Sequence, residues 1–187
     1  MKLYFPLFLL FVILVPFRSM AQQENEEAIK VIRHRFAEIE NEKAYIQMTP
    51  HLADDTCRFT IEIKKKNNKI YKIELRRVEN TRAYTYQYYY WDGELFFVYT
   101  RNDINEGEND KGIVTFRVFE YRHYFLGTRC IRSLYRGFRY TDKEPSVKNI
   151  EFMDCFKAYE ERERGDKLLE YAEKNEWKSI CQMHIPL

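Results

Sequence analysis

The chain has 187 residues, of which 32% are charged and 17% aromatic, and its formal net charge is +2. Because basic and acidic residues nearly balance, the composition argues against a nucleic-acid partner, and the high charged fraction predicts a well-solvated surface. The length is sufficient for one domain with a substantial hydrophobic core.

The first 21 residues have the pattern of a secretory signal peptide. Lys2 precedes an apolar run from residue 3 to residue 17, and Ser19-Met20-Ala21 matches the small-x-small cleavage signal. Two prolines interrupt this run, which is short for a membrane span, so an uncleaved anchor is the less favoured alternative. We therefore expect a periplasmic or secreted protein that touches the membrane only if this segment stays uncleaved. Residues 22–187 are predicted to form a single α+β domain.

An amphipathic helix is predicted from Glu24 to Glu40, where apolar residues recur at helical spacing (Ile29, Ile32, Phe36 and Ile39). A hairpin follows it. The segment from Arg58 to Lys64 alternates strictly between apolar and charged residues, and Tyr71 to Leu75 repeats the apolar face after a Lys/Asn turn. Since one face is apolar and the other charged, this hairpin is expected near a sheet edge.

The aromatic segment from Thr81 to Thr100 is the predicted centre of the fold. Asp92-Gly93 favours a two-residue type I′ turn, because both of its central residues adopt positive φ. A row of four tyrosines shares one face of the first arm, and Tyr89 and Trp91 lie on the other (the row is Tyr84, Tyr86, Tyr88 and Tyr90). With neither face polar, this hairpin should be central and covered on both sides, by protein or by a ligand.

The polar stretch from Arg101 to Gly112 is predicted to be a loop. A strand from Val114 to Leu126 and its return from Arg129 to Tyr135 follow, and residues 136–145 are predicted to form another loop. The expected fold is α+β: an N-terminal helix, a six-stranded antiparallel β-meander with a curved sheet, and a C-terminal helix. Both helices are expected on one face of the sheet, which would leave part of the aromatic surface open.

The C-terminal helix is predicted from Val147 to about Lys174, and Gly165 marks the expected bend, because glycine costs roughly 1 kcal/mol relative to alanine in a helix. Beyond it, Trp177 and Ile180 should attach the tail to the core. Four cysteines allow three pairings, of which Cys155–Cys181 is disfavoured by the length of the helix between them (the others are Cys57 and Cys130). Bridges from the C-terminal segment to the sheet are favoured, and reduced, buried thiols are the alternative.

No nucleophile elbow, phosphate loop, zinc signature or calcium loop is present, and the four histidines are scattered. The sequence therefore predicts a protein that is not an enzyme and has no metal or cofactor. Glu120 and Arg122 form its most suggestive polar pair, since residues two apart share a strand face. They are expected either to form the floor of a polar pocket or to form cross-strand ion pairs, and the ion pairs are favoured.

The segments YYYWDGELFFVY, from Tyr88, and FEYRHYFLGTRCIRSL, from Phe119, resemble small exported bacterial proteins with no assigned function. The resemblance covers residues 71–134. It implies an envelope setting and a similar sheet, but no active site, and the four cysteines, although Cys130 falls within the second segment, are not part of the shared pattern.

The tyrosine row has two interpretations, as core or as an exposed platform for a glycan, peptide or protein. The resulting functional prediction is an exported, non-enzymatic binding protein that uses an aromatic sheet face. The alternative is a carrier of small apolar ligands, in which the sheet curls into a barrel-like cup lined by tyrosines.

Overall fold

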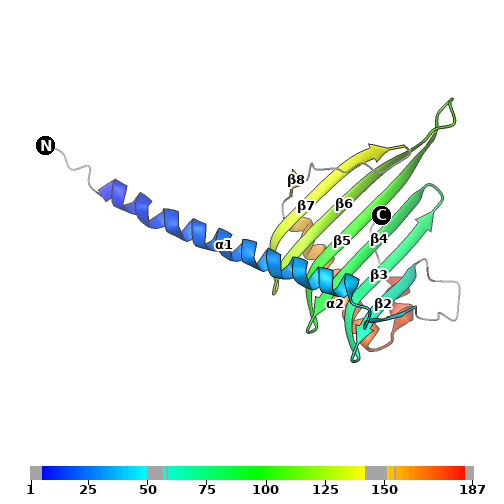
Figure 1. The fold of residues 1–187 in the computed structure, drawn as a ribbon, viewed down its shortest axis with the longest axis horizontal. Helices are drawn as coiled ribbons and strands as arrows, with labels where there is room; N and C mark the ends of the chain where they lie inside the picture. Colours follow the sequence, from blue (N-terminus) through cyan, green and yellow to red (C-terminus); the bar gives the residue numbers. More distant parts are fainter. Residues whose placement is uncertain (1–5, 50–56, 58, 142–150, 154, 184–187) are drawn as a thin grey trace.

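The computed structural model describes residues 6–49, 57, 59–141, 151–153 and 155–183 (Figure 1). One antiparallel sheet dominates it, with eight strands that pair strictly in chain order. The strands are β1 (Ile46–Met48), β2 (Thr60–Lys66), β3 (Lys69–Glu79), β4 (Arg82–Trp91), β5 (Glu94–Glu108), β6 (Val114–Leu126), β7 (Arg129–Tyr140) and β8 (Glu151–Phe152). Helix α1 (Pro6–Asn41) precedes the sheet, and helices α2 (Phe156–Glu173) and α3 (Trp177–Gln182) close the chain.

The predicted α+β class and the order of helix, meander and helix are confirmed. The six predicted strands correspond to β2 through β7, and the aromatic hairpin β4–β5 is central, with positive φ at both Asp92 and Gly93. The edge strands β1 and β8 have only three and two residues, too few for a periodic pattern to reveal. The sheet is open between these edges, so the barrel-like closure of the alternative prediction does not form.

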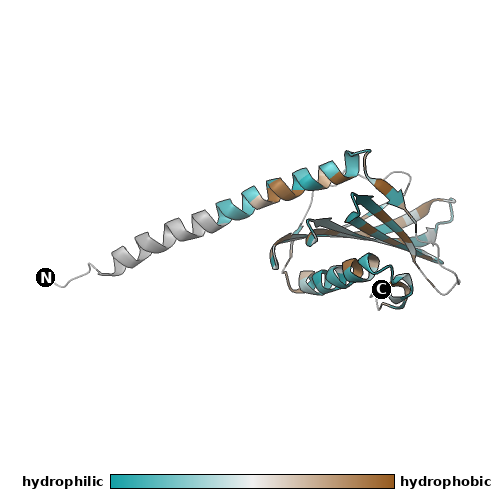
Figure 2. Ribbon diagram, turned by 90° about the horizontal axis from the view of Figure 1, so that it is seen from below, coloured by the Kyte–Doolittle hydropathy of each residue, from teal (hydrophilic) through white to brown (hydrophobic). Residues whose placement is uncertain are grey.

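The helices lie on opposite faces of the sheet, with α1 over one face and α2 and α3 over the other (Figure 2). The expectation that both helices cover one face is wrong. Both arms of the aromatic hairpin are apolar on both faces, and two separate helices satisfy this pattern. On the α1 side, the predicted helical stripe is confirmed: Ile29, Ile32 and Ile39 are buried against the sheet.

The tyrosine row faces α2 and belongs to the core. Tyr88 and Tyr90 are 0% exposed, and their hydroxyls donate hydrogen bonds to Glu161 Oε2 and to the Gly165 carbonyl, each at 2.8 Å. Gly165 does not bend the helix. It lies inside continuous α2, where an added Cβ would stand 2.8 Å from Leu95 Cδ2 and 3.0 Å from the Tyr88 ring. The absence of a side chain thus allows the helix to approach the sheet closely.

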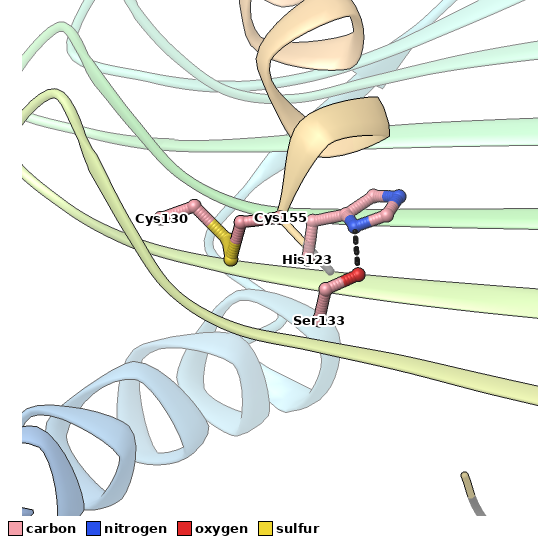
Figure 3. Close-up of a disulfide and its surroundings, with 4 residues drawn as sticks. All are labelled: His123, Cys130, Ser133 and Cys155. Carbon is pink, nitrogen blue, oxygen red and sulfur yellow. Dashed lines mark hydrogen bonds between the residues drawn. A yellow bond between two sulfur atoms is a disulfide. The ribbon is translucent and has the colours of Figure 1, made fainter. Parts of the chain in front are cut away.

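Two disulfides attach the C-terminal helices to the sheet, as predicted. Cys57–Cys181 links α3 to the chain just before β2, and Cys130–Cys155 links the start of β7 to the residue that precedes α2 (Figure 3). Ile180 is fully buried, which confirms its role in attaching the tail.

Several predicted boundaries are wrong. The expected loop from Arg101 to Gly112 is largely strand, because β5 continues to Glu108 and pairs with β6 to its end. Strand β7 likewise extends to Tyr140. The C-terminal helix begins at Phe156, after the short strand β8, and the part of its prediction in residues 147–150 lies outside the described residues.

Candidate functional site

Helix α1 crosses the sheet, and polar contacts at two places along the helix attach it to the strands. Near its C-terminal end, Glu40 accepts a hydrogen bond from Lys72 Nζ at 3.0 Å, and the Tyr89 hydroxyl lies 3.1 Å from the same carboxylate. Nearer its N-terminal end, Glu26 pairs with Arg132 of β7. Between these contacts the Phe36 ring packs against the ring of Tyr89, with centroids 5.1 Å apart.

A cavity of about 590 Å³ lies beside this helix, between α1 and strands β4 to β7. Its volume is within the range of small-molecule sites, about 300–1,000 Å³. Part of its lining is apolar or aromatic, and part is charged. The apolar lining comprises Ile32 and Phe36 of α1 with Phe97 and Tyr124 of the sheet, and the polar lining comprises Arg33, Gln87, Tyr99, Arg101, Glu120, Arg122 and Arg136. We call this cavity the α1-side pocket.

Glu120 is the central polar group of the α1-side pocket and is only 1% exposed. Its Oε1 accepts hydrogen bonds from the Tyr99 hydroxyl at 2.8 Å, from Arg101 Nη1 at 3.2 Å and from Arg136 Nη2 at 2.9 Å. Arg136 Nε binds the other oxygen, and Arg122 Nη2 lies 3.5 Å from it. The carboxylate therefore joins three neighbouring strands, β5, β6 and β7.

These contacts set the protonation state of the cluster. Burial alone would raise the pKa of Glu120, but hydrogen bonds from Arg136 and Tyr99 and the charges of Arg136 and Arg122 outweigh it, so the pKa lies below its usual value. Burial and the neighbouring Glu120 carboxylate raise the pKa of the Tyr99 hydroxyl above its usual range. At neutral pH the floor of the α1-side pocket is thus an ionised carboxylate held by neutral and cationic donors.

The predicted cross-strand ion pairs are present at Glu120, and Glu120 and Arg122 both line the α1-side pocket, whose use by a ligand stays a prediction. The sequence does not single out Arg33, Arg101 or Arg136 as site residues. Arg101 lies in the segment predicted to be a loop, and Arg33 is one of many charges on an amphipathic helix. The available signal was the alternation in β5 and β6, which places Arg101 directly opposite Glu120.

The tyrosine row, the other predicted site, is not an exposed platform. All four of its members are less than 10% exposed, and α2 and α3 cover them (Tyr84, Tyr86, Tyr88 and Tyr90). Only Tyr84 and Tyr86 reach a second, smaller cavity of about 290 Å³ on the α2 side. Phe119 and Tyr121 of β6 also line it, together with Asn102 of β5. We call this cavity the α2-side groove.

A serine–histidine pair lies on the same face of the sheet (Figure 3). His123 Nδ1 and Ser133 Oγ are 2.9 Å apart across β6 and β7, and both residues are 2% exposed. Burial lowers the pKa of His123 to about 4, which keeps the ring neutral at physiological pH. Because the serine hydroxyl is withheld from solvent, the pair connects two strands and is not arranged as a nucleophile and base.

Within the part of the chain that the structure describes, no group of three or more histidine, cysteine, aspartate or glutamate residues is placed to hold a metal ion. Nor does any described helix combine the length and apolar character that crossing a membrane requires. No family model, curated protein or solved structure matches the chain. The resemblance to exported bacterial proteins therefore stays a prediction, and the site is interpreted from its own geometry.

Proposed function

We propose that this protein is an exported, non-enzymatic binding protein whose ligand occupies the α1-side pocket. The observation that carries the proposal is the combination of an aromatic wall with a fixed polar floor in one cavity of suitable size. Most small-molecule sites have this composition, an apolar lining with a few oriented polar groups. The sequence predicted binding on the face with the tyrosine row. The proposal instead uses the aromatic residues on the opposite face of the sheet, which line the α1-side pocket.

Preorganisation supports a binding role for this cavity. The Glu120 carboxylate is held by donors from the two strands that flank β6, namely Tyr99 and Arg101 of β5 and Arg136 of β7, and α1 is fixed over the sheet by Glu40 and Phe36. A ligand therefore meets polar groups that are already ordered, which reduces the entropic cost of binding. The pocket also retains features of the apolar-ligand carrier, but in a crevice between a helix and an open sheet.

Export is the second part of the proposal. All four cysteines form disulfides, which indicates an oxidising compartment. The pattern of Lys2, the apolar run and Ser19-Met20-Ala21 supports passage through a secretory pathway. Together these features favour the periplasm or the exterior of the cell.

The test of pocket binding uses the uncharged fluorophore N-phenyl-1-naphthylamine and the purified mature protein. We expect saturable binding with enhanced emission, and about tenfold weaker binding for Phe36→Ala, which removes part of the aromatic wall. The matched control is Phe116→Ala. Phe116 is also a half-buried phenylalanine, but it stacks on Tyr140 outside the pocket. Equal affinities for the two variants, or no saturable binding, would refute the proposal.

The α2-side groove supports a second candidate function, recognition of a glycan. Asn102 Oδ1 is buried there without a hydrogen-bond partner among the described residues, and Tyr121 and Phe119 line the same groove. A sugar supplies both a hydroxyl donor and a ring face that stacks on an aromatic side chain. Binding to oligosaccharide arrays that is lost in Tyr121→Ala but kept in Tyr140→Ala would support this role. Arrays without any hit would count against it.

A further inference from the structure

Arginine is strongly over-represented in the α1-side pocket. Four guanidinium groups line it, against the single carboxylate of Glu120 (the arginines are Arg33, Arg101, Arg122 and Arg136). Asp103, just outside the lining, pairs with Arg101, with Nη2–Oδ1 at 2.7 Å. Even with Asp103 included, positive charges outnumber negative ones in and around the cavity.

Two of these arginines are committed to carboxylates of the protein. Arg136 binds both oxygens of Glu120, and Arg101 binds Asp103 through two nitrogens and Glu120 through a third. These contacts occupy most of the acceptor positions of Glu120, which also receives the Tyr99 hydroxyl. The remaining two arginines are left with little internal compensation.

Arg122 and Arg33 carry the least compensated charges of the four. The contact that Arg122 makes with Glu120 is 3.5 Å long, at the limit of a hydrogen bond, and its side chain is 32% exposed. Arg33 is exposed on α1 and has no hydrogen bond or ion pair to another described residue. One guanidinium thus comes from the sheet and the other from the helix that covers it.

We infer that the ligand of the α1-side pocket is an organic anion, with one acidic group bound by Arg122 and Arg33 and an apolar body against Phe36, Phe97 and Tyr124. Guanidinium groups bind carboxylate, sulfonate or phosphate oxygens in a planar, two-point geometry and are more weakly hydrated than ammonium groups. Beside an apolar wall that excludes water, such a charge-assisted hydrogen bond is strengthened. This inference rests on the proposed function and adds the chemical class of its ligand.

A matched pair of probes separates the two ideas. 8-Anilinonaphthalene-1-sulfonate and N-phenyl-1-naphthylamine share one aromatic body and differ in the sulfonate. We expect the sulfonate probe to bind the mature protein about tenfold more tightly than the neutral one, and more weakly as salt is added.

Three substitutions give the expected charge dependence. Arg122→Gln and Arg33→Gln should each weaken binding of the sulfonate about tenfold, whereas Asp103→Asn should tighten it several-fold by releasing positive charge on Arg101. Affinity for the neutral probe should change less than twofold in all three. Arg129→Gln, an exposed arginine outside the pocket, is the control and should leave both affinities unchanged.

The outcomes distinguish the inference from the proposed function. If the neutral probe binds in a Phe36-dependent way but the sulfonate shows no preference and no response to Arg122→Gln or Arg33→Gln, the anionic class is wrong and the pocket remains a binding site. If neither probe depends on Phe36, both fail. If the sulfonate responds to Arg129→Gln as strongly as to Arg122→Gln, its binding is general electrostatic attraction and the inference is overturned.

Discussion

On the α2 side of the sheet, tyrosine and aliphatic side chains pack against two helices that two disulfides hold in place. On the α1 side, charged side chains run across the middle strands, and a single helix covers part of them. Strand β4 contributes to both faces: Tyr88 and Tyr90 are enclosed beneath α2, while Gln87 and Tyr89 face α1.

We infer that the α2 side contributes mainly to stability and that the α1 side is suited to ligand recognition. The α2 side buries the larger apolar cluster and has its tyrosine hydroxyls satisfied by α2. The α1 side keeps buried charges such as Glu120, Glu74 and Lys72, which cost desolvation energy and are held by compensating partners. Such a buried ion-pair cluster adds little net stability compared with apolar residues of the same volume, although removing one partner is costly, and it presents fixed polar groups to a ligand. Four experiments test this division, from the largest expected effect to the smallest.

Removal of the disulfides, both of which lie on the α2 side, should have the largest effect on the free energy of unfolding. The Cys57→Ser/Cys181→Ser variant opens a link across 124 residues, and Cys130→Ser/Cys155→Ser opens one across 25. Chain entropy alone then predicts losses of about 5 and about 3.5 kcal/mol in the free energy of unfolding. Urea denaturation measures both values. A smaller loss for the longer loop would show that residual structure or strain dominates over chain entropy.

Glu120→Gln tests the cost of a buried charge cluster on the α1 side. Removing one charge leaves Arg101, Arg122 and Arg136 partly uncompensated, and we expect a loss of about 3 kcal/mol in urea denaturation. Glu106→Gln is the matched control, because Glu106 also joins two arginines, Arg117 and Arg139, but lies at the surface. Its loss should be much smaller, and equal losses would mean that burial of Glu120 does not matter.

The two faces should also differ in their response to acid. Burial holds the pKa of His123 at about 4 in the folded state, against a usual 6.5, so the unfolded chain binds a proton first as the pH falls. The contribution of neutral His123 to the free energy of unfolding is fully present above pH 6.5. As the pH falls from 6.5 to 4, the free energy of unfolding decreases by up to about 3 kcal/mol. On the α1 side the pKa values of Glu120, Glu74 and Glu40 are lowered, so their contribution is lost only below pH 4.5.

His123→Gln separates these two stages. The variant keeps a polar group beside Ser133 but does not titrate, so the decrease between pH 6.5 and 4 should disappear while the decrease below pH 4.5 persists. Unfolding free energies measured in urea at successive pH values give both slopes. An unchanged slope above pH 4.5 would assign that stage to other groups.

Gly165→Ala has the smallest expected effect and tests the close approach of α2. The new methyl group would crowd Leu95 and Tyr88, at a cost of about 2 kcal/mol, and the better helix propensity of alanine returns about 1 kcal/mol. A net loss of about 1 kcal/mol in thermal or urea denaturation is expected. Glu170→Ala, on the exposed side of the same helix, should cause no such loss. Stabilisation by Gly165→Ala would show that the contact has room to adjust.

Local pattern predicted much of the fold. The spacing of Ile29, Ile32 and Ile39 determined the buried stripe of α1, and the Asp92-Gly93 dipeptide determined the central hairpin turn, because periodicity and positive φ are properties of a short segment. The length of the helix between Cys155 and Cys181 was enough to disfavour a bridge between these two cysteines, and the observed bridges pair each of them with another cysteine.

Pattern alone was not sufficient where partners distant in sequence decide the outcome. The polar segment after Arg101 was predicted to be a loop, yet most of it is strand, because its backbone pairs with that of β6 as far as Glu108. Gly165 reads as a helix break, yet it is the point where α2 meets Leu95.

The sequence by itself determined that both faces of the central hairpin must be covered, and that Glu120 and Arg122 share a face. Only the tertiary structure decided which helix covers which face, and hence that the tyrosine row is core. It also brought Arg33 of α1 to the same pocket that Arg122 and Glu120 of β6 line. The reason is physical: alternation fixes which side chains share a face, but the occupant of that face comes from elsewhere in the chain.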